Sequence, residues 1–426
     1  MTADSETRLA KATLEDRIVG TLIGSALGDA VGLYTEFLTK EQAQAAYPSG
    51  EFSLLPNATP FKRDFHRLKH RNGEWTDDTD HSLLILLSYL HNGQPDHKDF
   101  AARLRVWVEQ GLRALDTAPL GLGRTVGSVV SNEGFLDNPY KVAAECWRRG
   151  GHQVAANGSL MRTHTLGLAM LYETEADTFE VAARFSAVTH VDPRCVTSCM
   201  VGTALVRGLV RGLVTTTDDV DALVRRAVDA FPRIRELLLA EGVYEADDPS
   251  LDEDEHAFAT SLDALELDGA GIGYVLKALG SSLVVLRRAL NQQPTLYSQA
   301  TSFQPLISEL VMHAGDADTN AVTAGAFLGA WAGYKALPWK GGLRHDAWLL
   351  SKADSLCLAL GVKEGGYDGK ADPDTAPDGG RGFITPEQTK EKFEEIQERM
   401  DADVREFMEA EETAAKERAK KKGWFF

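Results

Sequence analysis

The sequence contains no long hydrophobic run, few cysteines and too little positive charge to balance its acids. Its apolar stretches fall short of the ~20 residues that a helix needs to span a bilayer. The first residues, Met1 to Glu15, are polar and do not resemble a secretory signal. These absences argue against a membrane or secreted protein. We therefore expect a soluble protein of the cytoplasm or nucleus, with no membrane partner.

Cysteine is scarce: the chain has four, and none form a Cys-x-x-Cys pair. Cys195 and Cys199 lie four positions apart on a predicted helix, a spacing that could suit a metal. Small buried side chains on one helical face are the simpler interpretation. A reducing compartment fits this pattern.

The shortage of positive charge gives a net charge of −18. That balance disfavours nucleic acid and anionic lipid, so we expect neither as a partner. An acidic protein that binds a phosphate-bearing ligand needs metal ions, backbone amides or local arginine to do so. Hydrophobic residues make up 43% of the 426 residues, which is enough for a large core.

Alternating strand patterns are also scarce, whereas helical periodicity recurs along the chain. It predicts helices at about 17–32, 81–92, 98–114, 140–148, 159–173, 176–188, 195–214, 218–229, 232–241, 270–290, 302–313 and 319–336. We therefore predict an all-α fold.

The first of these helices carries a glycine at every fourth position: Gly20, Gly24, Gly28 and Gly32. Each interior glycine costs a helix roughly 1 kcal/mol relative to alanine. Close packing by another helix, or access for a ligand, must offset that cost. The same spacing occurs in membrane helix pairs, but Asp16, Arg17 and Asp29 argue against that interpretation.

The composition divides the chain into three parts. Residues 1–364 form the predicted catalytic domain, with a core at about 16–340 and an acidic surface loop at about 245–256. Residues 365–382, rich in Gly, Asp and Pro, predict a linker or long loop. Residues 383–426 predict a charged amphipathic helix. Its apolar stripe packs on the body or on a partner, and both alternatives stay open.

Two acidic clusters stand far apart, each at the predicted first turn of an apolar helix. They are Thr76, Asp77, Asp78, Thr79 and Asp80 in the first, and Asp316, Asp318 and Thr319 in the second. Either cluster alone is compatible with a helix cap. Crowded carboxylates repel one another unless a cation neutralises them, and hard divalent ions prefer oxygen ligands. If the two helix starts converge, they make an all-oxygen metal site.

Other motifs suggest contacts with a ligand, each with a plainer alternative. Glu36 follows the glycine-striped helix and either reaches into a cleft or lies in a solvated loop. Asn157, Gly158 and Ser159 form a turn before a helix, suited to phosphate or to ordinary capping. His190 either holds a ligand or is structural. Gly121 and Gly123 form another glycine-rich turn.

Together, and in this order, these segments resemble the ADP-ribosylglycohydrolase family, which includes dinitrogenase reductase-activating glycohydrolase and the ADP-ribosyl-acceptor hydrolases. The matching stretches are Gly28 to Gly32 with Glu36, Trp75 to Thr79, Asn157 to Arg162, Thr189-His190, and Gly315 to Thr319. In this chain Asp80-His81 follows the first acidic cluster, where the family often has a small or aliphatic residue.

The resemblance implies a compact orthogonal multi-helix bundle with two divalent cations, Mg²⁺ or Mn²⁺, at the bottom of a cleft. Carried over residue by residue, it gives the metal ligands Thr76, Asp77, Asp78, Asp316, Asp318 and Thr319. The implied catalytic residues are Glu36, Asp77 and Asp316. The implied contacts to the diphosphate and ribose are Gly121, Gly123, Asn157, Gly158, Ser159 and His190.

The activity implied by the resemblance is hydrolysis of the glycosidic bond between the anomeric carbon of ADP-ribose and an acceptor. The substrate would be an ADP-ribosylated protein or a small ADP-ribose derivative, and we expect a monomer. The acceptor linkage, whether arginine, serine or an O-linked ester, stays open. Two alternatives remain: an inactive family member with a binding or structural role, and a metal-dependent phosphohydrolase with His345-Asp346 as its only candidate His-Asp pair.

Overall fold

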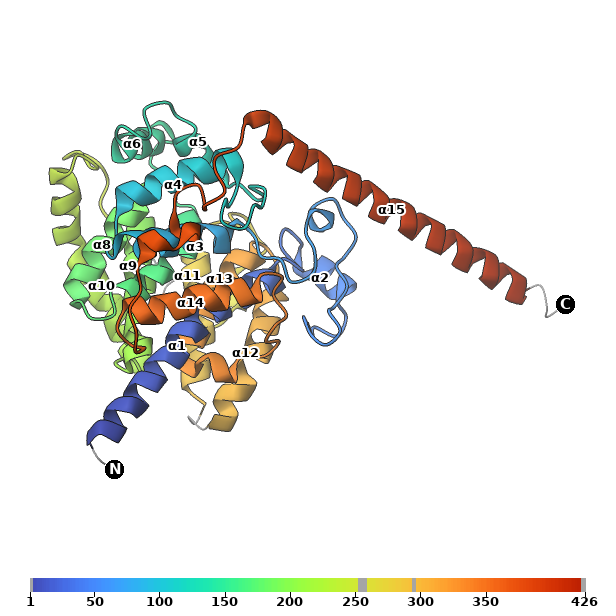
Figure 1. Ribbon diagram of the computed structural model, residues 1–426, viewed down its shortest axis with the longest axis horizontal. Helices are drawn as coiled ribbons and strands as arrows, with labels where there is room; N and C mark the ends of the chain where they lie inside the picture. Colours follow the sequence, from blue (N-terminus) through green and yellow to red (C-terminus); the bar gives the residue numbers. More distant parts are fainter. Residues whose placement is uncertain (1–2, 252–258, 293–295, 423–426) are drawn as a thin grey trace.

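A computed structural model describes residues 3–251, 259–292 and 296–422. Within that part of the chain the secondary structure is helical, apart from one isolated bridge between Ala156 and Tyr274. Figure 1 shows a body of packed helices from which one long helix, α15, extends past the loops around α2. The predicted all-α fold with a charged C-terminal helix is confirmed.

The longer helices overlap the predicted ones, although α1 begins at Ala3, well before the predicted start at residue 17. They are α1 (Ala3–Gly32), α3 (Asp77–Asn92), α4 (His97–Gln110), α6 (Pro139–Arg149), α7 (Leu160–Ala169), α8 (Glu175–Ala187), α9 (Pro193–Arg211), α10 (Thr217–Ala240), α11 (Val275–Leu290), α12 (Leu296–Val311), α13 (Ala317–Ala332) and α15 (Pro386–Lys422). Three helices were missed: α2 (Lys40–Ala46), α5 (Arg124–Val130) and α14 (Asp346–Ala359). The first two are too short to show a period, whereas α14 buries Leu349, Ala353 and Leu356 at helical spacing.

The two helices predicted at 218–229 and 232–241 form one helix, α10, with Pro232 inside it. Proline removes a backbone donor and costs a helix interior about 3 kcal/mol. The buried stripe continues across this position, from Ala227 and Phe231 to Ile234 and Leu238. Packing of that stripe therefore outweighs the local cost of the proline.

The glycine stripe of α1 packs directly on α13. A Cβ atom on Gly24 would lie 2.5 Å from the Gly325 oxygen, and one on Gly28 would lie 2.0 Å from the Ala321 oxygen. One on Gly32 would lie 2.3 Å from the Asp318 Cα. The predicted close approach of a second helix is confirmed. The register runs antiparallel, so the end of α1 meets the start of α13.

Residues 365–382, predicted to be a linker or long loop, pack against the body of the protein. Gly369 lies so close to α3 that a Cβ atom would be 1.7 Å from the Leu90 oxygen, and Thr375 is fully buried. In the acidic loop predicted at 245–256, Asp248 is buried and accepts hydrogen bonds from Arg148. Residues 252–256 of that loop lie outside the described residues.

Helix α15 docks through its first half. Met400 is buried, the Arg399 guanidinium donates to the Lys69 carbonyl, and Arg63 lies 4.3 Å from the centre of the Phe407 ring. The predicted stripe consists of Phe393, Ile396, Met400, Val404 and Phe407, and of these Phe393, Val404 and Phe407 stay exposed. Among the described residues, no helix combines the length and apolarity needed to cross a membrane.

We predict that Gly28→Ala destabilises the protein, because its methyl group would overlap the backbone of α13. Overpacking of a core costs about 1–3 kcal/mol, and backbone gives way less readily than a side chain. The midpoint of thermal unfolding should fall by several degrees or more. Gly366→Ala is the matched control, since a Cβ atom there meets nothing within 4 Å. Equal midpoints for the two variants would contradict the packing argument.

Candidate functional site

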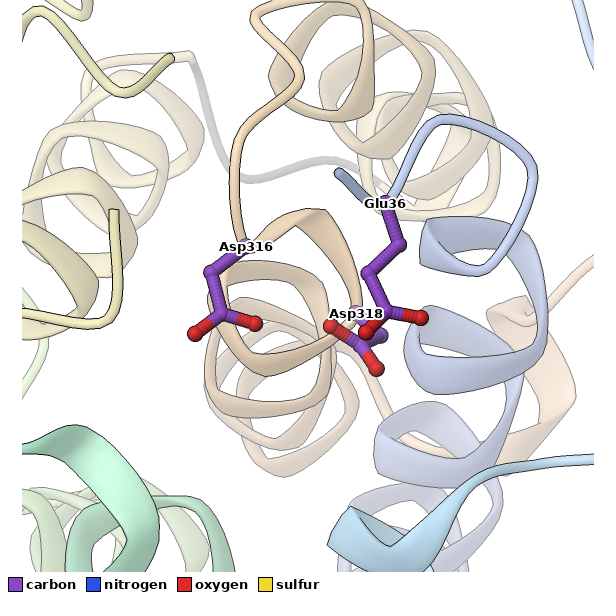
Figure 2. Close-up of side chains that lie close together, drawn as sticks. All are labelled: Glu36, Asp316 and Asp318. Carbon is purple, nitrogen blue, oxygen red and sulfur yellow. The ribbon is translucent and has the colours of Figure 1, made fainter. Parts of the chain in front are cut away.

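Three carboxylates from two distant segments meet at the junction of α1 and α13. Glu36 lies in the turn after α1, and Asp316 and Asp318 lie at the start of α13. One oxygen from each lies within 4.8 Å of the others, a spacing that could hold a metal ion. Figure 2 shows the three side chains pointing toward one another.

Backbone pairing fixes the two loops that carry these acids. The Phe37 amide donates to the Gly315 carbonyl at 2.7 Å, and the Gly315 amide donates to the Leu38 carbonyl at 3.1 Å. Gly315 has φ +71°, and a Cβ atom on it would lie 2.1 Å from the Leu267 oxygen. Only glycine fits this position without strain. The pairing holds Glu36 beside Asp316.

The first acidic cluster joins this group at the N-terminus of α3. Thr76 caps the helix: its hydroxyl accepts from the Asp78 amide at 3.4 Å and donates to Asp318 at 3.2 Å. Burial and neighbouring carboxylates raise the pKa of Asp78, whereas a hydrogen bond with the Thr319 side chain lowers it. The two helix starts, predicted to converge, therefore do so, and each remains a helix start as well.

Asp29, on α1, orients the start of α3 and was not among the predicted site residues. It is fully buried and accepts from the Thr76 amide at 2.9 Å, the Thr79 amide at 3.0 Å and the Thr79 hydroxyl at 2.5 Å. Burial raises its pKa to about 6, although these hydrogen bonds oppose the shift. A charged residue inside an apolar, glycine-striped helix was the signal that could have found it.

The carboxylates at these helix starts resist ionisation. Burial raises the pKa of Asp77, Asp78 and Asp318 well above the usual range, and neighbouring carboxylates raise each one further. Burial and Glu36 also raise the pKa of Asp316. Such a group is stable as anions only beside a compensating positive charge.

A divalent cation fits this arrangement. The donors are carboxylate and hydroxyl oxygens, the ligands that hard cations prefer. One oxygen of Asp78, Oδ1, is buried and has no hydrogen-bond partner among the described residues. The predicted metal ligands occur together at the starts of α3 and α13: Thr76, Asp77, Asp78, Asp316, Asp318 and Thr319.

Two of the predicted substrate-binding residues touch the acids directly. Gly121 has φ +88°, and a Cβ atom on it would lie 2.2 Å from Asp77 Oδ1, so glycine lets the turn approach the carboxylate. The Asn157 side-chain amide donates to Asp316 Oδ2 at 2.9 Å. Gly123 lies at the exposed N-cap of α5, farther along the same turn as Gly121.

His190 lies behind Gly158 in a buried chain of hydrogen bonds. The Thr189 hydroxyl accepts from Arg162 at 2.7 Å, and among the described residues the acceptor for its own hydrogen is Nδ1 of His190, also at 2.7 Å. The hydrogen of the neutral ring is then on Nε2, which has no partner among the described residues. Burial, aided by Arg162, lowers the pKa of His190 to about 3. The ring thus presents a neutral donor next to Gly158.

The Ser159 hydroxyl points into the core. It is fully buried and lies 3.1 Å from Ser186 Oγ and 3.3 Å from Cys199 Sγ. Cys195 and Cys199 are both buried and free, as expected for structural cysteines. The prediction that Ser159 contacts the substrate stays a prediction. Since the hydroxyl is buried, that contact would use the backbone amide of Ser159.

His66 was missed and is the direct partner of Glu36. Its Nε2 lies 2.6 Å from Glu36 Oε2, and the ring packs 4.9 Å from the Phe37 ring. The neighbouring Arg67 donates to the carbonyls of Tyr34 and Glu36, which ties the loop to the end of α1. Sequence spacing carries no signal for this contact, because the two residues lie on separate loops.

Asp80 turns to the other side of α3. It is buried and accepts from the indole nitrogens of Trp75 at 2.8 Å and Trp107 at 2.9 Å. Burial raises its pKa to about 7. His81 lies edge-on to Trp107, with 4.3 Å between ring centres. Asp80 and His81, which depart from the family pattern, therefore make separate contacts with tryptophan side chains in the core.

Comparison with known proteins agrees with this geometry. The sequence model of the ADP-ribosylglycohydrolase family matches residues 10–366, so the chain belongs to that family. An "ADP-ribosylarginine hydrolase Tri1" of Pseudomonas putida is 25% identical, over 76% of this chain and 72% of its own length. An uncharacterized protein of Archaeoglobus fulgidus is 28% identical, over 80% of this chain and 96% of its own.

Two further matches bear on family and fold. An "ADP-ribosyl-[dinitrogen reductase] glycohydrolase" of Rhodospirillum rubrum is 24% identical, over 51% of this chain and 66% of its own length. A solved structure titled "ADP-ribosylglycohydrolase-related protein complex" superimposes with a TM-score of 0.51 at 23% identity. It covers 81% of this chain and 98% of its own, which supports the fold.

We predict that Asp77→Asn with Asp78→Asn stabilises the metal-free protein at pH 7.5. Their pKa values are raised in the folded state, so each acid favours folding below its unfolded pKa of about 4 and loses that contribution as pH rises. The variant should therefore unfold at a higher temperature than the wild type at pH 7.5. The gain should shrink toward pH 4.

The measurement is thermal unfolding in excess chelator between pH 4 and pH 8. Asp137→Asn with Asp247→Asn is the control, because both side chains are exposed. A wild-type protein that is more stable than the Asp77, Asp78 variant at pH 7.5 in chelator would refute the electrostatic account.

Proposed function

We propose that this chain is a divalent-metal-dependent hydrolase that cleaves the bond between the anomeric carbon of ADP-ribose and an acceptor. The observation that carries the proposal is the meeting of Glu36, Asp316 and Asp318, with Thr76 of the other acidic helix start bonded to Asp318, in a member of this family. The names of the relatives support a substrate that is an ADP-ribosylated protein. All the acids proposed as ligands are present, which favours an active enzyme over an inactive relative.

Two divalent cations, Mg²⁺ or Mn²⁺, are proposed to be held by the residues at the two helix starts: Thr76, Asp77, Asp78, Asp316, Asp318 and Thr319. Bound divalent ions lower the pKa of water and polarise sugar oxygens. Asp77 or Asp316 would accept a proton from the attacking water. Glu36 would assist departure of the acceptor, and His66 keeps its carboxylate in place.

The neutral donors of the site suit the rest of the substrate. Asn157, Gly158, His190 and the turn of Gly121 and Gly123 lie around the acids without adding negative charge. They are proposed to hold the diphosphate and the adjoining ribose. Residues 1–364 would form the catalytic domain, residues 365–382 a connecting loop and residues 383–426 an accessory helix.

The first test is a panel assay with ADP-ribosyl-arginine, ADP-ribosyl-serine and O-acetyl-ADP-ribose, each with Mg²⁺, with Mn²⁺ and with chelator. We expect release of ADP-ribose from at least one substrate, dependent on metal. Asp77→Asn with Asp78→Asn should abolish turnover while the helical circular dichroism is retained. Full activity of that variant, or of the wild type in chelator, would exclude the proposal.

The second test addresses Glu36 and its partner. Glu36→Gln removes the ionisable group and should lower kcat by about 10²–10⁴, the usual range for a general acid or base. His66→Ala should lower kcat less, with little change in KM, because the Glu36 carboxyl is retained but loses its hydrogen bond. His152→Ala is the control, since His152 pairs with Asp248. Unchanged kcat in Glu36→Gln would rule out its role.

A further inference from the structure

Helix α15 encloses a cavity against the body of the protein. The cavity has a volume of about 280 Å³, close to the lower end of the range of about 300–1,000 Å³ for small-molecule pockets. Its walls come from residues 69–76, 115–120, 344–345 and the first turns of α15. We call it the α15 pocket. Helix α15 begins after the family match at residues 10–366 ends, so one wall of this pocket lies outside the matched region and the other walls lie within it.

The lining of the α15 pocket is rich in positive charge, in contrast to the chain as a whole. Its cations are Lys69, Arg71, Arg344, Lys392 and Arg399. Two of them are paired with acids of the same wall: Arg344 with Glu74 at 3.1 Å and Lys392 with Asp116 at 2.5 Å. Asp80 also lines the pocket, but both of its oxygens accept from indole groups.

The other three cations have no carboxylate within ion-pair distance among the described residues. Arg399 donates to a backbone carbonyl, that of Lys69. The Lys69 ammonium lies 4.7 Å from the centre of the Phe65 ring. The side chain of Arg71 is exposed, and the hydrogen bonds that Arg71 makes, both to Glu74, use its backbone amide and carbonyl. The exposed Glu395 is the one remaining acid of the lining.

The cations of the α15 pocket lie close enough together to affect the pKa values of their neighbours. Burial lowers the pKa of Arg399, and Arg71 and Arg344 lower it further against the opposing effect of Glu74. Burial likewise lowers the pKa of His70 to about 3, with Lys69 and Arg399 among the contributing charges. Cations held together in this way favour an anion between them. The α15 pocket therefore favours an anion, just as the carboxylate site favours a cation.

The chemistry of the walls narrows the class of anion. Guanidinium groups match phosphate with paired, charge-assisted hydrogen bonds. Trp75, Leu120 and Ile396 add apolar surface beside the arginines, which suits the uncharged part of a small molecule. The volume limits that molecule to roughly the size of a mononucleotide.

We propose that the α15 pocket binds a small phosphate-bearing molecule, with the phosphate on Arg71 and Arg399 and the remainder against Trp75 and Ile396. Helix α15 completes the site by supplying Ile396 and Arg399. Thr76 lines the pocket and also touches Asp318, so the two sites share one residue. This proposal does not depend on the hydrolase activity.

The test is isothermal titration calorimetry of the full chain in excess chelator, with inorganic phosphate, adenosine 5′-monophosphate and adenosine as probes. We expect the monophosphate to bind, inorganic phosphate to bind more weakly and adenosine not to bind. Arg71→Gln and Arg399→Gln should each weaken binding of the monophosphate at least tenfold. Arg405→Gln, an exposed arginine of the same helix, should bind it like the wild type.

Arg71→Gln is the decisive variant, because its guanidinium makes no hydrogen bond or ion pair within the described structure and its loss should leave the unfolding midpoint unchanged. A His190→Ala variant separates this pocket from the proposed substrate site. Undetectable binding to the wild type would overturn the proposal, as would unchanged binding to Arg71→Gln. Loss of binding in His190→Ala but not in Arg71→Gln would also overturn it, by placing the probe at the substrate site.

Discussion

The backbone contact between α1 and α13 is the constraint on which the rest of the structure depends. Glycines on both helices let the backbones approach so closely that a methyl group at Gly28 would lie 2.0 Å from a carbonyl oxygen. Because the helices run antiparallel, this contact brings the end of one to the start of the other. Glu36 and Asp318 meet for that reason, although they are far apart in the sequence. The close packing of α1 on α13 offsets the helical cost of each glycine and sets the register of the site.

The acids brought together in this way oppose folding unless a cation is present. Burial and mutual repulsion raise the pKa values of Asp77, Asp78 and Asp318. The structure holds them through contacts made by other groups, chiefly the hydrogen bonds of Asp29 to the first turn of α3. Functional sites commonly lower the stability of the folded protein. Here the cause is repulsion among buried carboxylates, which a bound cation would relieve.

Local charge in this protein differs from its overall charge. The net charge of −18 argues against binding to anions in general. Yet the neutral donors around Gly158 and the cations of the α15 pocket form two regions that offer hydrogen-bond donors to a phosphate. Net charge thus governs long-range attraction, whereas recognition depends on the few groups within reach of the ligand. Helix α15, which follows the family match, supplies one wall of the second region.

The sequence by itself determined the helical class, the glycine stripe and the two acidic helix starts, because periodicity and motif residues are local properties. The tertiary structure decided that the stripe packs on α13 and that the two helix starts converge. Only the tertiary structure decided which groups hold those acids in place. Asp29, His66 and the indoles around Asp80 act across long separations in the chain, and no spacing rule encodes such contacts. It also decided that Ser159 points inward and that α15 docks on the body. Local sequence patterns specify the secondary structure of a segment, and tertiary packing specifies which residues it contacts.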